Sequence, residues 1–452
     1  MGLRSRQGAA PKARPAAPGL AVRQAAVGLL TEVLDRKRSM EALFDPSSGD
    51  AAWRALPERD RRLARAIVTA ALRHHGQITH ILSRLIERPP RRAGAFHRIL
   101  EVATAQLLYL DVPDHAAVSV AMEQIGADRD ALHFKGLANA VLRRLGRERD
   151  AIIAGSSSPR FAVPDWLWQR WVAAWGEATA ARIVAANLEE PALDLTVKAD
   201  PAAWAETLGG MVVPTGSVRL VQEGPVEALA GYDEGAWWVQ DAAAALPARL
   251  LGGFAGKRVA DLCAAPGGKT AALALSGARV TAVDISAGRL RRVDTNLQRL
   301  GLEAELVEAD LLAWSPPEPF DAILLDAPCS ATGTIRRHPD IPWLKRPEDI
   351  AKLAVLQGRM IDKAVGWLRP GGTLVFSTCS IEPEEGEHQM AQALHRHALE
   401  IVPATADEIG GISEALLPSG AVRTLPCQLP GPTPRLSGLD GFFMMRVRKR
   451  RT

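Results

Sequence analysis

The chain has 452 residues, 47% of them hydrophobic and 23% charged, so it is long enough for two or three domains with a buried core. This balance excludes wholesale disorder and a fibrous repeat, and the lack of any uninterrupted run of about 18 apolar residues predicts no membrane span. The net charge of +4 is uneven, because residues 1–150 hold 25 Lys and Arg against 16 Asp and Glu. This basic third predicts a nucleic acid partner, although a solvated arginine-rich surface gives the same count.

Residues 1–18 are basic but lack the apolar segment of a secretory signal. We expect a disordered basic tail, with an organellar transit peptide as the alternative. None of the four cysteines forms a C-x-x-C pair, which disfavours zinc, and free thiols are expected in a reducing, cytoplasmic compartment. We expect a monomer without a bound metal.

Apolar residues recur at helical spacing through residues 19–150, in segments such as VRQAAVGLLTEVL and RRLARAIVTAALRH. Four prolines, at positions 57, 89, 90 and 113, separate these segments. The segment FKGLANAVLRRLGR predicts a final basic helix. We therefore expect an all-helical domain over residues 19–150.

Residues 151–235 begin with the linker-like stretch AGSSSPRFAVP. A Trp-rich helix, WLWQRWVAAWG, and short strands such as LDLTVKA follow, which predicts a small α/β module. The tryptophans at 166, 168, 171 and 175 either pack in a core, the commoner role, or stack on bases.

Strands and helices alternate through residues 236–452. Apolar segments such as KRVADLC, ARVTAVDI, DAILLD and GTLVFST predict buried strands, and AGRLRRVDTNLQRLG predicts an intervening helix. This order predicts an α/β doubly wound, Rossmann-like domain with a parallel sheet covered on both faces. Ligands of such folds bind outside the carboxyl ends of the strands.

The first strand of this domain leads into DLCAAPGGKT, where Gly267 and Gly268 allow a tight turn before a helix. The free N–H groups at the start of that helix point to the same place. A G-x-G-x-x-G motif is absent, so a nicotinamide dehydrogenase is not favoured. Asp284, Asp310 and Asp326 end three successive strands; one such Asp is usually a cap, but three beside a glycine turn predict a nucleoside-bearing cofactor.

Two cysteines follow the next two strands, Cys329 in DAPCS and Cys379 in STCS. If these strands are neighbours, about 4.8 Å apart, both thiols and Asp326 share one cleft. A thiolate there is a strong nucleophile, although a single cysteine in such a place is more often inert. Segment 334–346, TIRRHPDIPWLKR, predicts RNA contact at the mouth of the site, with a solvated loop as the alternative. We expect Cys263 to be a packing residue and Cys427 to have no role.

Taken together, DLCAAPGGKT, VDIS, DAPCSATGTIRRHPDIPWL, STCS and DGFF resemble the motifs of the RNA 5-methylcytosine methyltransferases. WWVQDAAAALPARLL, ahead of the fold, resembles them as well. The N-terminal segments RRLARAIVTAALRH, PDHAAVSVAMEQ and LANAVLRR are similar to the NusB RNA-binding fold. This pairing is typical of the bacterial Sun/RsmB small-subunit rRNA methyltransferases.

The resemblance implies S-adenosylmethionine as cofactor and a cytosine of 16S rRNA as substrate, the one usually numbered 967. It implies that Cys379 is the nucleophile, that Cys329 assists product release and that Asp326 lies between cofactor and base. It also implies that Asp284 binds the ribose and that Asp310 lies near the adenine. The glycine turn would contact the cofactor through Cys263, Ala264, Ala265, Pro266, Gly267, Gly268 and Lys269.

A cytosine-5 methyltransferase that acts on another RNA remains open on the sequence, as do two other classes of protein. A non-catalytic RNA-binding assembly factor would explain the N-terminal half, but not both cysteines and all the strand-end carboxylates. A DNA cytosine methyltransferase would use the cysteine of the P-C pair, Cys329, as nucleophile and would leave Cys379 unexplained.

Overall fold

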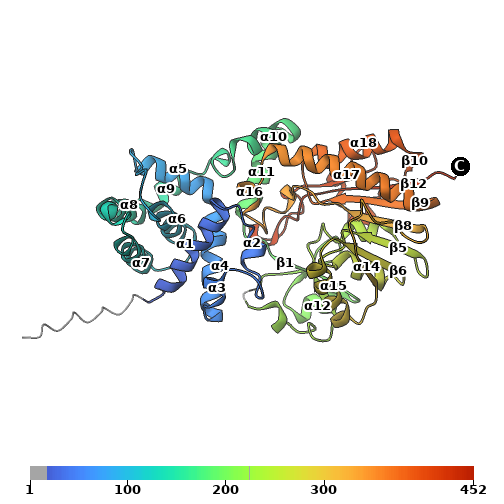
Figure 1. Ribbon diagram of the computed structural model, residues 1–452, viewed down its shortest axis with the longest axis horizontal. Helices are drawn as coiled ribbons and strands as arrows, with labels where there is room; N and C mark the ends of the chain where they lie inside the picture. The colour runs from blue at the N-terminus through green and yellow to red at the C-terminus, as the bar shows by residue number, and fades with distance from the viewer. Residues whose placement is uncertain (1–17, 223, 452) are drawn as a thin grey trace, which may run out of the picture. The chain divides into compact units, whose positions relative to one another are not determined.

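The computed structural model describes residues 18–222 and 224–451, so the predicted basic tail, except residue 18, lies outside the described residues. The chain forms two compact units, of which the first ends at Phe161 and the second begins at Ala162 (Figure 1). The finer subdivision at 150/151 and 235/236 stays a sequence-based prediction.

The first unit is helical, as predicted. Helix α6 is buried on nearly every side and packs against α1, α4, α7 and α8. In α4, Ala64, Ile67, Val68 and Ala71 are buried at helical spacing, while the other face carries arginines. The helices are α1 (Leu20–Leu34), α2 (Met40–Leu43), α3 (Ala51–Arg54), α4 (Glu58–Arg73), α5 (His75–Leu85), α6 (Phe96–Tyr109), α7 (Asp114–Ala127), α8 (Lys135–Arg147) and α9 (Arg149–Gly155).

The second unit begins with two helices and a small antiparallel sheet of order β2–β3–β1–β4. In α10, Trp171 is fully buried and its indole N–H donates to a Glu382 carboxylate oxygen at 3.0 Å. The other three tryptophans of α10 pack around the same cluster, so these residues form core. The elements are α10 (Asp165–Trp175), α11 (Glu177–Leu188), β1 (Leu193–Val197), α12 (Pro201–Thr207), β2 (Met211–Val212), β3 (Val218–Leu220) and β4 (Trp237–Val239).

The second sheet has the strand order β10–β12–β9–β8–β5–β6–β7, and β11 pairs with β12. Strands β5 to β9 are parallel, as predicted. Strands β10, β11 and β12 are antiparallel, so the sheet is mixed and not purely parallel. The strands are β5 (Arg258–Leu262), β6 (Arg279–Asp284), β7 (Glu305–Glu308), β8 (Phe320–Asp326), β9 (Leu368–Thr378), β10 (Leu399–Ile401), β11 (Val422–Thr424) and β12 (Phe442–Lys449).

Helices cover both faces of this sheet (Figure 1). Ile323 and Leu325 of β8 belong to the core under α17 and α18, whereas Ala322 and Leu324 face α13 and α14, as the alternation of a strand requires. Within the described ranges no helix is both long and apolar enough to cross a membrane. The helices are α13 (Leu246–Leu251), α14 (Gly268–Leu275), α15 (Ala287–Leu300), α16 (Ile341–Leu344), α17 (Pro347–Trp367) and α18 (Glu387–Arg396).

Candidate active site

The predicted site residues gather at one edge of the mixed sheet. Parallel strands end at the same edge, and β5, β6, β8 and β9 each end beside a predicted site residue. In the register of β8 with β9, Asp326 lies opposite Ser377, two residues before Cys379. The two strands are therefore neighbours, which is the condition under which Cys329, Cys379 and Asp326 were predicted to share one cleft.

The glycine turn follows β5. Cys263 has φ 63° and Gly267 has φ 102°, so the chain reverses here through left-handed conformations. The turn is tied to β6, because the Ala264 N–H donates to the Val283 carbonyl at 3.1 Å. Helix α14 starts at Gly268, which directs its first N–H groups at the strand ends.

Asp284 ends β6 and is only 2% exposed. Its carboxylate accepts the Ala265 N–H at 3.2 Å and the Ser286 N–H at 3.1 Å, and it lies 3.4 Å from the Arg289 guanidinium. A carboxylate accepts up to about four hydrogen bonds, so capacity remains for a hydroxyl. The next residue, Ile285, is 68% exposed, an unusual position for a large apolar side chain.

Asp310 follows β7 and is exposed. Its carboxylate accepts the Leu312 N–H at 2.9 Å, so it also closes the turn after the strand. Asp284, Ile285 and Asp310 together offer acceptors and one apolar surface beside the glycine turn. Sequence reasoning missed Ile285, although an apolar residue directly after a strand-end Asp was visible as a signal.

Asp326 is held on both carboxylate oxygens. Lys269 donates to Oδ2 at 2.8 Å and the Ser377 hydroxyl donates to Oδ1 at 2.8 Å. The Lys269 ammonium also lies 5.3 Å from the centre of the Phe442 ring. Burial lowers the pKa of Lys269, but the negative charges around it, Asp326 first, outweigh burial and raise that pKa. Asp326 thus has a fixed orientation and a proton donor in contact with it.

The Sγ atoms of Cys329 and Cys379 lie 3.4 Å apart, within hydrogen-bond distance for sulfur. The hydrogen bond to Cys379, followed by burial, raises the pKa of Cys329 well above the ordinary value for a thiol. Burial raises the pKa of Cys263 as well, which suits a packing residue. Cys427 lies with the tryptophan cluster of α10 and not at the strand ends.

A buried carboxylate that sequence reasoning missed lies beside the Cys329 loop. Glu385 is fully buried and accepts from the Ser330 N–H at 2.9 Å, from the Ser330 hydroxyl and from the Gln357 amide at 3.0 Å. The only signal in the sequence was an acidic stretch after STCS, and acidic stretches are usually solvated.

Segment 334–346 is structured rather than a solvated loop. Arg336 is buried and donates to the Ser437 carbonyl at 2.9 Å. Arg337 is 38% exposed and its guanidinium pairs with the buried Asp440 carboxylate. The two neighbouring arginines therefore differ, because Arg336 is buried and Arg337 is partly exposed.

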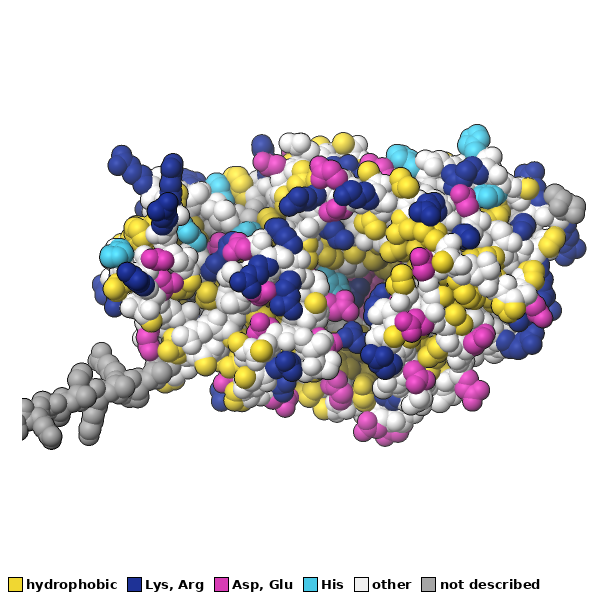
Figure 2. Space-filling view, in the orientation of Figure 1, with side chains coloured by type: hydrophobic (Ala, Val, Ile, Leu, Met, Phe, Trp, Pro, Cys, Tyr) yellow, Lys and Arg dark blue, Asp and Glu magenta, His cyan; other side chains and the backbone are white. Residues whose placement is uncertain are grey.

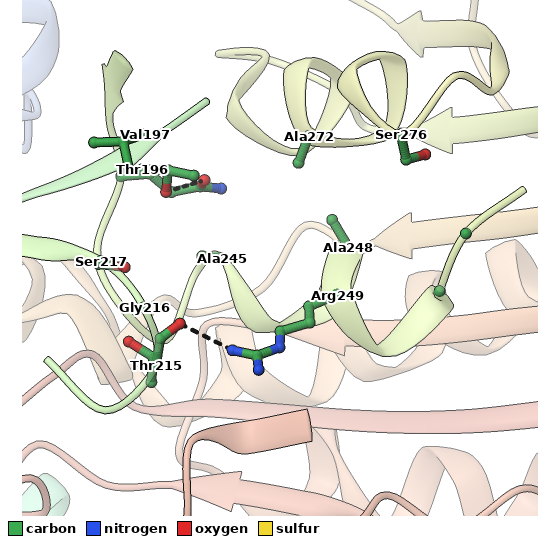
Figure 3. A pocket seen from close by; sticks show the side chains of 13 residues that line it. Thr196, Val197, Thr215, Gly216, Ser217, Ala245, Ala248, Arg249, Ala272 and Ser276 are labelled. Carbon is green, nitrogen blue, oxygen red and sulfur yellow. Dashed lines mark hydrogen bonds between the residues drawn. The ribbon is translucent and has the colours of Figure 1, made fainter. Parts of the chain in front are cut away.

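A separate hollow of about 320 Å³ opens between β1, α13 and α14 (Figure 3). Thr196 and Val197 line it from β1, Ala248 and Arg249 from α13, and Ala272 from α14. Arg249 donates to the Thr215 carbonyl at 3.0 Å, as the dashed line in Figure 3 shows. None of the predicted site residues lines this hollow.

Family models match both units of the chain. Residues 249–447 match the model of the 16S rRNA methyltransferase RsmB/F, and residues 20–147 match the NusB family. Among curated proteins, ribosomal RNA small subunit methyltransferase B of Klebsiella pneumoniae is 37% identical, with 95% of this chain and 98% of that protein covered. The protein of the same name from Sodalis glossinidius is 38% identical over the same shares.

Solved structures give the same fold. The protein PH0851 superposes with a TM-score of 0.71 at 21% identity, covering 96% of this chain and 99% of its own. A methyltransferase homolog from Pyrococcus horikoshii has a TM-score of 0.53 at 29% identity and covers 63% of this chain and 95% of its own. These matches confirm the predicted methyltransferase fold, the NusB-like domain and S-adenosylmethionine as cofactor. The chain belongs to the family of ribosomal RNA small subunit methyltransferase B.

Proposed function

We propose that this protein transfers a methyl group from S-adenosylmethionine to carbon 5 of a cytosine in 16S rRNA, the base numbered 967 in the family. The approach of the two thiols to 3.4 Å, at the edge that also holds Asp326 and Lys269, is the observation that carries the proposal. The names of the 36–38% identical relatives support the rRNA substrate. The cytoplasm and a monomeric state stay predictions.

The strand-end residues fit the cofactor. Asp284 has the remaining acceptor capacity that a ribose needs, and the exposed Ile285 and Asp310 suit the face and edge of an adenine. The backbone from Cys263 to Lys269 would hold the methionine part at the start of α14. When bound, S-adenosylmethionine supplies an electrophilic methyl carbon on a sulfonium.

Carbon 5 of cytosine is a poor nucleophile, and attack by a cysteine at carbon 6 activates it. The Cys379 sulfur forms a bond to carbon 6, and the electron pair displaced from the ring moves toward N3. Asp326, held by Lys269 and Ser377, binds N3, and the Asp326–Lys269 pair shares a proton with it. The resulting enamine makes carbon 5 reactive toward the methyl group.

Release reverses the covalent step. The proton on carbon 5 leaves to solvent, and the electron pair of that bond restores the double bond between carbons 5 and 6. The bond between carbon 6 and sulfur breaks, and its electron pair returns to Cys379. The N3 proton returns to the Asp326–Lys269 pair. The Cys329 thiol lies within hydrogen-bond distance of the departing sulfur and stabilises it. The target base must be splayed out of its stack to reach these groups.

Substitution of each cysteine tests these roles. Cys379→Ala should abolish methylation and form no adduct, because no thiolate reaches carbon 6. Cys329→Ala should accumulate a protein–RNA adduct that survives denaturing electrophoresis and disappears on nuclease digestion, since departure of the sulfur is no longer assisted. Cys427→Ala, a cysteine in the tryptophan cluster, is the matched control and should behave as wild type.

Three outcomes would contradict parts of the proposal. An adduct in Cys379→Ala but not in Cys329→Ala would reverse the two roles. A folded wild-type protein that binds 16S rRNA but never methylates it would favour the assembly-factor class. Bisulfite sequencing of the RNA methylated in vitro identifies the base, and a signal elsewhere than at cytosine 967 would change the target.

A further inference from the structure

The two thiols of the site lie in an uneven electrostatic field. Glu385, which ends the short helix Pro383–Glu385, places a fully buried carboxylate next to the Cys329 loop. The hydrogen-bond partners that the structure gives it, Ser330 and Gln357, are neutral, so its charge is not cancelled locally. The negative charge of Glu385 contributes to the raised pKa of Cys329, after the hydrogen bond to Cys379, burial and the charge of Cys379.

Glu385 also fixes the position of Cys329 from both sides. It binds the N–H and the hydroxyl of Ser330, the residue after Cys329. Its other partner, the Gln357 amide, also donates to the carbonyl of Pro328, the residue before Cys329, at 2.9 Å. One carboxylate therefore determines where this loop lies.

Two cations, Lys269 and Arg337, interact electrostatically with Cys379. Burial lowers the pKa of both cations, but nearby negative charges outweigh burial, Asp326 first for Lys269 and Asp440 first for Arg337, and Cys379 makes a smaller contribution to each rise. Each cation has its own carboxylate, Asp326 for Lys269 and Asp440 for Arg337. The charged groups around the two thiols thus come from four elements and from Glu385 beside the Cys329 loop. They are Lys269 of α14, Asp326 of β8, Arg337 after the short helix Thr332–Thr334, and Asp440 before β12.

We infer that Glu385 is a positioning residue that keeps the proton shared by the two thiols on Cys329 and the negative charge on Cys379. A like charge disfavours ionisation of Cys329, beside whose loop the Glu385 carboxylate is buried. Cys329 is then the donor in the S–H···S contact, both before attack and when the sulfur departs. The inference rests on the proposed function for its meaning, but it concerns a property of the free protein.

Competitive alkylation measures where the charge lies. Limiting iodoacetamide is applied to the full chain between pH 6 and 9, and mass spectrometry gives the initial rates at Cys329 and Cys379. In the wild type Cys379 should react faster near pH 7, because the thiolate is the reactive form. In Glu385→Gln the ratio of the two rates should fall by about tenfold, as expected for removal of a nearby buried charge.

The variants separate charge from architecture. Gln at 385 can accept from the Ser330 and Gln357 N–H groups and donate to the Ser330 hydroxyl, so the loop keeps its bonds and loses only the charge. Glu382→Gln changes an equally buried carboxylate three residues away that faces Arg170 and Trp171, and should leave the ratio unchanged. Glu385→Asp keeps the charge and should keep most of the ratio.

Two results would overturn the inference. One is an unchanged ratio in Glu385→Gln that still binds S-adenosylmethionine. The other is a faster reaction at Cys329 than at Cys379 in the wild type, which decides the matter even if Glu385→Gln does not fold. Alkylation needs neither RNA nor turnover. A protein that fails to methylate cytosine would therefore contradict the proposed function without affecting this measurement.

Discussion

Carboxylates near the strand ends differ in their environment. Asp261 in β5 is fully buried, accepts the Thr270 hydroxyl at 2.6 Å on one oxygen and has no partner for the other among the described residues. Burial raises its pKa to about 7, and nearby Asp326 and Asp284 add to the rise, against the Thr270 hydrogen bond and Lys269. Asp261 therefore holds its proton in the folded state at a pH where the unfolded chain has lost it.

This difference makes stability depend on pH. The unfolded aspartate ionises near pH 4, so between about pH 4 and 7 the folded state binds more protons than the unfolded chain. As the pH rises through this range, the free energy of unfolding therefore falls, by up to ~1.4 kcal/mol per pH unit. Asp261→Asn removes the titration. Its stability relative to wild type should rise from pH 5 to 7 and level off above, as measured by urea unfolding. A difference that stays constant over this range would contradict the assignment.

The sequence predicted where the strand-end residues lie, because parallel strands bring their carboxyl ends to one edge whatever the rest of the fold does. Cys329, Cys379 and Asp326 could be placed together on that ground alone. Glu385 and Ser377 could not be recognised as part of the site, since their importance lies in side-chain contacts. For the same reason the sequence did not distinguish Arg336, which is buried, from Arg337, which is partly exposed.

Among the elements, the small antiparallel sheet is fastened to the C-terminal part of the methyltransferase domain. Arg219 of β3 lies opposite Asp194 of β1 and binds both of its oxygens, at 2.6 and 2.7 Å. The same guanidinium donates to the carbonyls of Leu436 and Gly438. These carbonyls precede Asp440, which holds Arg337 at the site, so the sheet helps to position a site residue.

Breaking this buried pair should be costly. Arg219→Met leaves the Asp194 charge buried and unpaired, which costs about 3–5 kcal/mol of unfolding free energy. The double variant Arg219→Met, Asp194→Leu removes both charges and should recover much of the loss. Chemical denaturation of both variants measures the coupling. Equal losses in the single and double variants would show that the pair is not what fastens the sheet.

The antiparallel strands show what sequence patterns miss at this scale. Strands β5, β6, β8 and β9 have apolar runs, and a long or medium helix follows β5, β6 and β8, so these elements could be predicted from the sequence. Strands β10 and β11 have three residues each and are strands only because β12 lies beside them. Their pairing depends on contacts far apart in the sequence, which periodicity does not report.

On the scale of the whole molecule the charge is divided between the units. The excess of basic over acidic residues lies in residues 1–150, and Figure 2 shows Lys and Arg side chains over the visible face of the N-terminal helices. Exposed arginines occur on α4 and α8, at positions Arg59, Arg62, Arg65, Arg143, Arg144 and Arg147. The residues proposed for chemistry all lie in the second unit, so we predict that affinity for RNA can be separated from catalysis.

A chain that begins at Ala162, where the second compact unit starts, tests this division. It contains the strand-end site and should bind S-adenosylmethionine as the full chain does, which also reports whether it folds. It should bind 16S rRNA fragments more weakly, and log affinity should fall less steeply with log salt, by about 0.7–0.9 for each phosphate that the protein no longer neutralises. Equal slopes for the two proteins would show that the basic N-terminal helices do not contact the RNA backbone, and would favour a protein partner for them.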